Sequence, residues 1–333
     1  MTTVAATAPA VLELLRPARR IACICHRNPD GDALGSLLGL RLILQEALPS
    51  VTVSVHCVDP VPESFAFLPG AGAVQGPPTI AHGDAVVFVD SAEPKLTEMH
   101  VTHPQLFAEG HPPSVNIDHH HTNPGYGTVN MVVDASSTCE IVLELADELG
   151  WKVSPEAATC LLTGVYTDTG GLLHSNTTAA VYRSVGRLLR LGARHQQAIT
   201  AVFRSAKIST LKLWGRVLEK ISVTPEGGVI SAVTEGDFRA TGADYAELTG
   251  AIDYVNAVPG MRFSLVLSER DGKVKGSLRT LRDDVDVSAM ASAFSGGGHK
   301  KAAGFALPGR LKPEVRWTVV DGQAAGAVPS AGA

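Results

Sequence analysis

Three short apolar runs in the first 120 residues each end in aspartate or histidine, and this pattern constrains the fold more than any other. IACIC (21–25) is followed by HRNPDGD, AVVFV (85–89) by Asp90, and SVNI (114–117) by DHHH. Such runs, separated by helix-like segments such as 32–48, predict βαβ units and a parallel sheet. Because open parallel sheets bind ligands at the carboxyl ends of their strands, we expect these polar residues to meet at one edge.

The rest of the chain predicts a second domain. Helical periodicity extends from about 137 to 220, and GGVISAV, RFSLVLSE and KVKGSLRT then have strand character. DVDVSAMASAF predicts a helix that runs into the glycine stretch GGGH. A chain of 333 residues also exceeds the ~250 residues at which single cores stop growing. We therefore expect an α/β protein with a parallel-sheet domain at 1–194, a helical linker at 195–212, a smaller α/β domain at 213–310 and a tail at 311–333.

Composition and charge exclude several classes of protein. No apolar stretch approaches the ~20 residues that a bilayer span requires, and the N-terminus lacks the features of a signal peptide. Five cysteines without a CxxC pair indicate buried structural thiols, not a disulfide framework or a zinc finger. A net charge of −5 opposes broad contact with duplex nucleic acid but permits a local patch for a short anion. We expect a cytoplasmic protein with no membrane partner.

Each polar segment has a structural alternative when it is considered alone. Pro29-Asp30-Gly31 is a good β-turn, and Asp90 alone would suit a helix cap. The run DHHH (118–121) would suit a polar loop, although adjacent Asp and His also form the carboxylate–histidine–metal relay of metal sites. An EF-hand is excluded, because DGDALG lacks a third acidic position before its glycine and no glutamate stands at the twelfth position.

Together the segments predict a metal site. They supply carboxylate and imidazole ligands without a thiolate, a mixture that suits Mn²⁺ or Mg²⁺ better than structural Zn²⁺. With so many carboxylates, two ions about 3.5–4 Å apart are favoured over one, because such pairs stabilise both the attacking and the leaving oxygen of a phosphoryl displacement. The pattern therefore indicates phosphoester hydrolysis. The candidate ligands are His26, Asp30, Asp32, Asp90 and one or two of the histidines in the DHHH run.

Four motifs resemble those of a known family. HRNPDGDALGS, VDSA, DHH and YTDTGG, in this order and at these separations, resemble the motifs of the DHH phosphoesterases, which include RecJ exonucleases, family II inorganic pyrophosphatases and NrnA-type nanoRNases. The resemblance covers about residues 20–307, and GGGHKKAAG (296–304) resembles the signature of the DHH-associated C-terminal domain. It implies a metal-binding catalytic first domain, a substrate-binding second domain, and an active site in the cleft between them.

The resemblance also implies which residues hold the two ions. One ion is expected to bind His26, Asp30 and Asp90, and the other Asp32, Asp90, His119 and Asp168. Asp90 would then bridge the ions, and a hydroxide between them would attack phosphorus. Asp168 is identified by the resemblance alone, since an aspartate before Thr-Gly otherwise suits a helix terminus.

The other residues of the histidine run receive different roles. By the same resemblance, Asp118 is expected to orient a histidine, and His120 to contact the phosphate or the leaving group. His121 extends the usual pair to three and has no assigned role.

The second domain is expected to hold the substrate. Between residues 262 and 301, eight Lys or Arg oppose five Asp or Glu, a local charge of +3. By resemblance, Arg279 and His299 hold the substrate's phosphate or terminal nucleotide. Glycines would let backbone N–H groups approach an anion, although the stretch is not a Walker A loop. These glycines are Gly296, Gly297 and Gly298.

We therefore expect a two-metal phosphodiesterase that releases 5′-mononucleotides from very short RNA or DNA oligonucleotides and linear dinucleotides, with 3′-phosphoadenosine 5′-phosphate as a further substrate. Its partners would be these short single-stranded substrates and nucleotide phosphates, its cofactors two divalent ions, Mn²⁺ or else Mg²⁺, and a homodimer is left open. A cyclic-dinucleotide phosphodiesterase is the main alternative. A family II pyrophosphatase is disfavoured by GGGH, and a non-catalytic nucleotide-binding module by the intact ligand set.

Overall fold

The computed structural model describes residues 3–204 and 206–312, except for the side chain of His299. The chain divides into two compact units, Met1–Ser205 and Ala206–Ala333. The domain limits expected at 194 and 213 lie on either side of this division. The segment expected as a helical linker contains one helix of unit 1 and the start of the first helix of unit 2. From residue 313 onward, the expected tail lies outside the described residues.

Unit 1 is built on a parallel sheet, as the alternation of strands and helices predicts. Within the described residues the sheet has six strands, all parallel, in the order β3-β2-β1-β4-β5-β6. The strand order reverses at β1 and β4, and such a switch point is where open α/β sheets bind ligands. The strands are β1 (Arg20–Ile24), β2 (Thr52–His56), β3 (Val74–Gln75), β4 (Ala85–Val89), β5 (Ser114–Asp118) and β6 (Val129–Val132).

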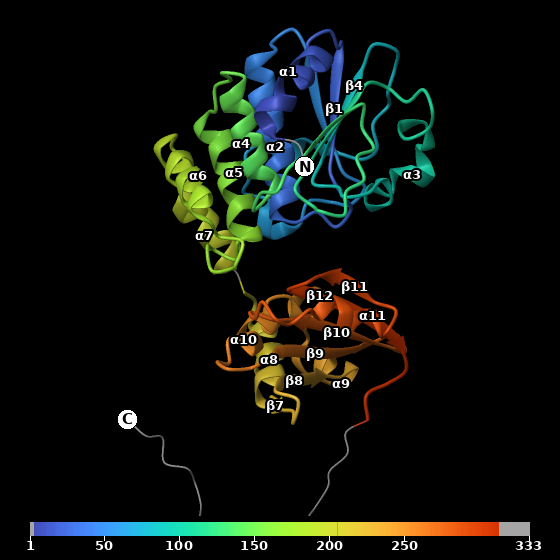
Figure 1. Ribbon diagram of the computed structural model, residues 1–333, viewed down its shortest axis with the longest axis vertical. Coiled ribbons are helices and arrows are strands. Elements are labelled where there is room, and N and C mark those ends of the chain that lie inside the picture. Colours follow the sequence, from blue (N-terminus) through green and yellow to red (C-terminus); the bar gives the residue numbers. More distant parts are fainter. Residues whose placement is uncertain (1–2, 205, 313–333) are drawn as a thin grey trace, which may run out of the picture. The chain divides into compact units, whose positions relative to one another are not determined.

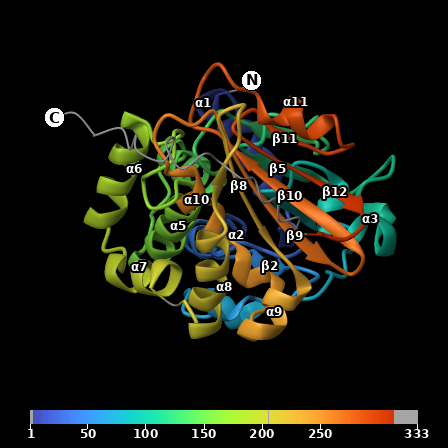
Figure 2. The ribbon, with the colours of Figure 1, turned by 90° about the horizontal axis from the view of Figure 1, so that it is seen from below.

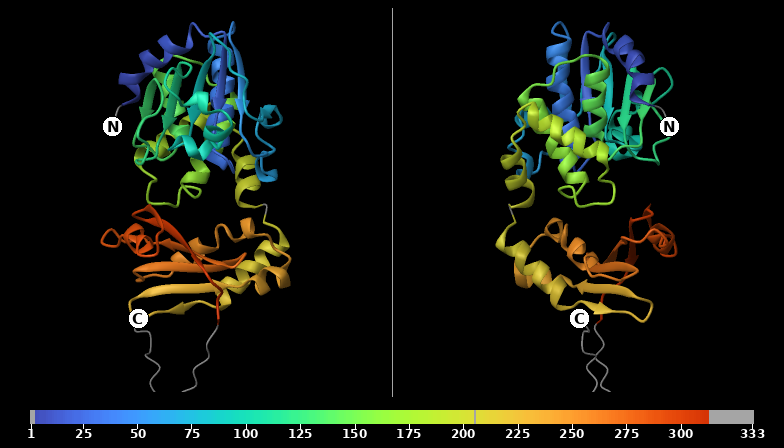
Figure 3. Two further views of the ribbon diagram at one scale, coloured as in Figure 1. Left: turned by 90° about the vertical axis from the view of Figure 1, so that its right-hand side faces the viewer. Right: turned by 60° about the vertical axis from the view of Figure 1, so that its left-hand side comes forward.

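Helices cover one face of this sheet, and α6 and α7 lie outside α5 (Figures 1 and 3). Alternate residues of a strand point to opposite faces. Val87 belongs to the large core beneath the helices, whereas Phe88 packs with Met99 in a smaller cluster on the other face. The helices of unit 1 are α1 (Val4–Leu15), α2 (Gly31–Ala47), α3 (Met99–Thr102), α4 (Thr138–Glu148), α5 (Pro155–Asp168), α6 (Ala179–Arg190) and α7 (His195–Phe203), with 3₁₀ turns at Glu63–Phe65, Ala71–Ala73, Pro94–Thr97 and Pro104–Leu106.

Glycines let α2 approach α5 closely. Gly31, Gly35 and Gly39 recur every four residues and so share one face of α2. A Cβ added at Gly35 would lie 2.6 Å from the carbonyl oxygen of Cys160 and 2.9 Å from the Cys139 sulfur. Because real Cβ atoms do not approach this closely, the contact requires glycine. It brings the N-terminal end of α2 beside α5.

Unit 2 is built on a mixed sheet in the order β11-β12-β10-β9-β8-β7, in which β8 and β9 form the parallel pair among the described strands (Figure 2). The expected strands GGVISAV, RFSLVLSE and KVKGSLRT are confirmed as β8, β9 and β10. The strands are β7 (Ser222–Val223), β8 (Gly228–Val233), β9 (Phe263–Arg270), β10 (Lys273–Arg279), β11 (Gly297–His299) and β12 (Ala302–Pro308).

The helices of unit 2 form two small cores with this sheet. Val266 of β9 packs with α8, α9 and α10, whereas its neighbours Leu265 and Leu267 pack with α11. The expected helix DVDVSAMASAF is shorter than its pattern, because Asp286 caps it by accepting from the N–H groups of Ser288 and Ala289. The helices are α8 (Ile208–Glu219), α9 (Glu235–Thr241), α10 (Ala251–Asn256) and α11 (Val287–Ser292), with a 3₁₀ turn at Tyr245–Leu248.

Two expectations from composition can be compared with the structure. All five cysteines are buried and form no disulfide, as expected for structural thiols. Across the described part of the chain, no helix combines the length and the apolar character needed to cross a bilayer.

We expect Gly35→Ala to lower the free energy of unfolding of unit 1 by about 1–3 kcal/mol, because the added methyl group overpacks the contact between α2 and α5. Gly186→Ala is the matched control, since its Cβ would meet nothing closer than 3.9 Å and alanine favours the helix. Urea denaturation measures both variants. Equal stability of Gly35→Ala and the wild type would show that the helices can separate without cost.

Candidate active site

The ends of β1, β4 and β5 bring the predicted polar residues together at one edge of the unit 1 sheet. The three strands are neighbours, with β4 in the middle. Asp90 follows β4 directly, and His119 and His120 follow β5. His26 and Asp30 lie in the loop between β1 and α2. The structure thus confirms the expected convergence at the switch point of the sheet.

Asp90 lies at the centre of this cluster. Its Oδ2 is 3.4 Å from Nε2 of His26, while its Oδ1 is 3.6 Å from Nε2 of His119 and 3.7 Å from Nδ1 of His120. The backbone of Asp90 is left-handed, with φ of 52°, a conformation that aspartate tolerates better than most residues. Its role is therefore not the helix cap that remained open from the sequence. The two oxygens of one buried carboxylate face two different sets of side chains.

These side chains form overlapping groups whose ligand atoms lie within 4.8 Å of one another. One group, His26, Asp30 and Asp90, is identical to one of the two ligand sets implied by the family motifs. Another group, Asp32, His119 and Asp168, contains three of the four residues of the other set. Asp90 is the fourth residue of that other set. Because Asp90 also lies next to His119, it connects the two sets. The groups are His26, Asp30 and Asp90; Asp32, His119 and Asp168; and Asp90, His119 and His120.

Asp32 and Asp168 reach the cluster from helices. Asp32, in the first turn of α2, is fully buried, and its carboxylate accepts the backbone N–H groups of Thr138 at 2.7 Å and Cys139 at 3.0 Å. Asp168 is the last residue of α5, and its Oδ2 lies 3.3 Å from Nε2 of His119. The close packing of α2 on α5 is what brings these two acids near each other.

Asp118 contacts His120, the residue that the family motifs place beside the phosphate or the leaving group. Oδ1 of Asp118 lies 2.9 Å from Nδ1 of His120, and its Oδ2 accepts a hydrogen bond of 2.6 Å from the amide of Asn123. Sequence reasoning missed Asn123, although Asn123-Pro124-Gly125 directly after the histidine run is a turn signal that could have indicated that the chain turns back here. His121 differs from its neighbours, since its side chain is about half exposed and faces Asp134 at 3.7 Å.

The electrostatics of the cluster favour a bound cation. Burial and the charge of Asp90 raise the pKa of Asp32 to about 7. Burial opposes charge on His26, but hydrogen bonds to Asp30 and Asp90 raise its pKa to about 11. Several buried carboxylates thus compete for few positive charges, and a divalent ion would relieve their repulsion. Oxygen and imidazole donors in overlapping groups fit hard divalent ions.

The predicted substrate residues of unit 2 lie near one another in the sheet. Arg279 of β10 and His299 of β11 both pair with Ala302 of β12, one from each side. Arg279 is partly buried, and its guanidinium donates to the carbonyl of Leu278 at 2.9 Å. The side chain of His299 lies outside the described residues.

The glycine stretch has a packing function that the sequence did not reveal. A Cβ at Gly296 would lie 2.3 Å from the carbonyl oxygen of Gly304, and Gly298 has φ of 144° with Ala302 oxygen 2.6 Å from an added Cβ. At Gly297 an added Cβ would meet nothing within 4 Å. Close approach of β11 to β12 therefore explains two of the three glycines without any ligand.

Part of the basic charge of unit 2 is paired locally, although the net charge of +3 between residues 262 and 301 is unchanged by this pairing. Three of the eight cations between residues 262 and 301 form ion pairs with nearby aspartates. These pairs are Arg270 with Asp271, Arg282 with Asp284, and Lys301 with Asp283.

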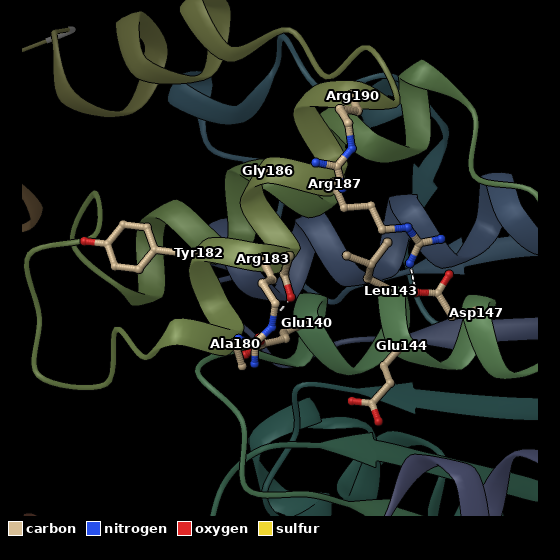
Figure 4. Close-up of a pocket in the computed structure, with 11 residues that line it drawn as sticks. Glu140, Leu143, Glu144, Asp147, Ala180, Tyr182, Arg183, Gly186, Arg187 and Arg190 are labelled. Carbon is tan, nitrogen blue, oxygen red and sulfur yellow. Dashed lines mark hydrogen bonds and ion pairs between the residues drawn. The ribbon is translucent and has the colours of Figure 1, made fainter.

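A separate cavity of about 600 Å³ lies between α4 and α6 (Figure 4). Acids of α4 face arginines of α6, and Arg187 pairs with Asp147 across it. Balanced charges of this kind favour a salt-bridged contact between helices over an anion site. The charged residues are Glu140, Glu144 and Asp147 of α4 and Arg183, Arg187 and Arg190 of α6.

Comparison with known proteins decides the family. Residues 20–165 match the N-terminal domain of the DHH family, and residues 227–321 match the DHHA1 domain. The bifunctional oligoribonuclease and PAP phosphatase NrnA of Thermus thermophilus is 36% identical over 85% of this chain and 83% of its own length. The chain belongs to the DHH family. Its members are metal-dependent phosphoesterases, and this chain is accordingly a hydrolase of that class.

A further relative agrees with this DHH-family assignment, and a solved structure shares the fold. The protein of the same name from Bacillus subtilis is 26% identical over 85% of this chain and 87% of its own length. An exopolyphosphatase-related protein from Bacteroides fragilis has the same fold, with a TM-score of 0.81 and 23% identity over 93% of this chain and 92% of that one. The two-unit α/β architecture of the DHH-family chain is thus shared along nearly its whole length.

We expect the metal-free protein to lose stability as the pH rises from 5 to 8. The pKa of Asp32 is about 7 in the folded chain, above its usual 3.8, so the folded state binds the extra proton between these values and stability falls as the pH rises. The raised pKa of His26 has the same effect above pH 6.5, the usual pKa of histidine, because the folded chain then keeps a proton that the unfolded chain loses. Thermal unfolding with a chelator at each pH measures this, and added Mn²⁺ should raise the melting temperature more at pH 8 than at pH 5.

In the control variant Asp32→Asn, the dependence on pH between 5 and 7 should flatten. An unchanged melting temperature across this range in the metal-free wild type would contradict the repulsion among the buried carboxylates.

Proposed function

We propose that this chain is a phosphodiesterase that hydrolyses very short RNA or DNA oligonucleotides and linear dinucleotides to 5′-mononucleotides, and that it also dephosphorylates 3′-phosphoadenosine 5′-phosphate. The observation that carries the proposal is the position of Asp90, with one oxygen toward His26 and the other toward His119. Relatives named for oligoribonuclease and PAP phosphatase activity support the choice of substrates. The cytoplasm is the proposed location.

We infer that the site holds two divalent ions, with Mn²⁺ preferred and Mg²⁺ as the alternative. His26, Asp30 and Asp90 would hold one ion, and Asp32, Asp90, His119 and Asp168 the other. Bound ions would supply positive charge that stabilises the negative charge developing on the phosphoryl oxygens. The absence of a thiolate from these groups supports oxygen-preferring ions over zinc.

His120 is the proposed proton donor to the leaving oxygen. The bond from Nδ1 to Asp118 holds the imidazole in one orientation, so that Nε2 is the nitrogen that would transfer the proton. Asp118 is in turn held by Asn123. This chain of contacts would let His120 act without reorienting during the reaction.

Unit 2 is proposed to bind the nucleotide part of the substrate. Arg279 and the backbone of Gly297 and His299 are the proposed contacts, and the shared register of Arg279 and His299 with Ala302 supports this grouping. Two of the three glycines are already explained by packing, so Gly297 is the glycine best suited to approach an anion.

We expect rapid release of mononucleotides from a labelled dinucleotide with Mn²⁺ present, and slower release as the oligonucleotide lengthens. The time course includes a cyclic dinucleotide, 3′-phosphoadenosine 5′-phosphate and pyrophosphate. His120→Ala should lower kcat at least about a hundredfold, as loss of general acid catalysis does. The matched control His121→Ala should stay near the wild type, since His121 faces Asp134 outside the cluster.

A preference for the cyclic dinucleotide or pyrophosphate would keep the site and overturn the proposed substrate class. Equal losses in the two histidine variants would instead contradict the role given to His120.

Arg279→Ala should raise KM for the dinucleotide about tenfold or more and leave kcat nearly unchanged, because the residue is proposed to bind the ground state and the transition state equally. Lys275→Ala, on the same strand but exposed, is the control and should change neither constant. Steady-state kinetics separates the two constants. A loss confined to kcat would show that Arg279 acts on the transition state.

A further inference from the structure

Thr138, the first residue of α4, contacts both of the buried carboxylates at the centre of the cluster. Its backbone N–H donates to Oδ2 of Asp32 at 2.7 Å, and its hydroxyl donates to Oδ1 of Asp90 at 3.1 Å. Thr138 is fully buried and belongs to neither proposed ligand set. One residue therefore links an acid of one set to the acid that both sets share.

Thr138 is held rigidly by its own neighbours. Ser137 caps α4 by accepting the N–H of Glu140 at 3.2 Å. Glu140 in turn accepts from the N–H and the hydroxyl of Ser136 at 3.1 and 2.9 Å, and from the hydroxyl of Ser184 on α6 at 3.0 Å. Glu140 lies at the edge of the cavity in Figure 4, where it ties α6 to the start of α4. The donors of Thr138 are thus in place before any ligand binds.

The hydroxyl has a specific effect on Asp90. The outer torsion of an aspartate side chain is broad, so its two oxygens can turn with little resistance. A hydrogen bond to Oδ1 opposes this rotation and keeps that oxygen on the side of His119 and His120. Oδ2 then remains on the side of His26, at 3.4 Å. The single hydrogen bond from the Thr138 hydroxyl to Oδ1 therefore fixes the direction of both oxygens of Asp90.

We propose that Thr138 is a positioning residue that holds Asp90 with one oxygen toward each ligand set, and thereby couples the binding of two divalent ions. This inference rests on the proposed function, because it takes Asp90 as the shared ligand. Loss of the hydroxyl weakens the binding of the second ion more than that of the first. The backbone bond to Asp32 does not depend on the side chain, so Asp32 stays in place.

Three variants separate the hydroxyl from the rest of the residue. Thr138→Val keeps the shape and removes the donor, whereas Thr138→Ser keeps the donor and removes a methyl group. Thr138→Ala is the second variant without a hydroxyl and carries the same expectation if the valine variant does not fold. The helix cap is unaffected in all three, because Ser137 supplies it. Circular dichroism of each metal-free variant checks the fold.

The experiment is a titration of the metal-free full chain with Mn²⁺, followed by calorimetry and by electron paramagnetic resonance. In the wild type we expect two bound ions and the signal of a spin-coupled pair. In Thr138→Val the second ion should bind about tenfold more weakly, as expected for the loss of a hydrogen bond to a charged group, with the coupled signal reduced at two equivalents. Thr138→Ser should stay within about twofold of the wild type.

The outcomes distinguish this inference from the function on which it rests. Two ions bound to Thr138→Val with wild-type affinity and an unchanged coupled signal would overturn the positioning role while leaving the proposed function intact. Equal weakening in the serine and valine variants would also overturn it, because the methyl group would then be responsible. A wild-type chain that binds a single Mn²⁺ would overturn both this inference and the proposed two-ion site, whereas the substrate time course tests the proposed activity separately.

Discussion

The parallel pairing of β4 with β1 on one side and β5 on the other is the constraint on which the rest of this structure depends. Parallel strands end at the same edge of a sheet, so three segments distant in sequence deliver their polar residues to one place. A different register would move Asp90 away from both groups of histidines. The helical layer then completes the cluster, because α2 and α5 bring acids from a second direction.

Collecting carboxylates in one buried place opposes folding, and the structure shows how the chain reduces this cost. Asp32 accepts two backbone N–H groups at the start of α4, where the helix dipole also favours negative charge. Asp30 caps α2 by accepting from the N–H groups of Asp32 and Ala33. Helix N-termini therefore stabilise acids that the active site needs, and a bound ion would neutralise the rest.

The two units differ in how firmly the fold fixes the positions of their candidate functional groups. In unit 1 each proposed ligand lies at, or just beyond, the end of a strand or a helix, so the fold sets the positions of the donor atoms. In unit 2, two of the three glycines serve sheet packing, and part of the basic charge is paired with aspartates. Under the proposed function, hydrolysis would take place on the residues of unit 1, and the choice of substrate would depend on the groups of unit 2 that are not used in packing or ion pairs.

Much of the fold was predictable from local patterns. Apolar runs ending in aspartate or histidine were sufficient to predict the parallel sheet, and the strand character of GGVISAV, RFSLVLSE and KVKGSLRT was sufficient to predict β8, β9 and β10. The helix at Val4–Leu15 was not predicted; its buried residues Val4, Ala8, Val11 and Leu15 have helical spacing, but Pro9 lies inside the helix, where proline is normally unfavourable. A periodic pattern of apolar residues predicts that a helix or a strand forms, but it does not predict which other element that helix or strand will contact.

The sequence by itself determined the residue types of the site and the strands that carry most of them, because these are local properties of the chain. Family motifs were needed for Asp168, which ends a helix like many other aspartates. Only the tertiary structure decided that Thr138 and Asn123 hold the acids in place, and that Asp90 turns one oxygen to each group. Most of these contacts join residues far apart in the chain, so their geometry exists only after α4 and the strands have packed together.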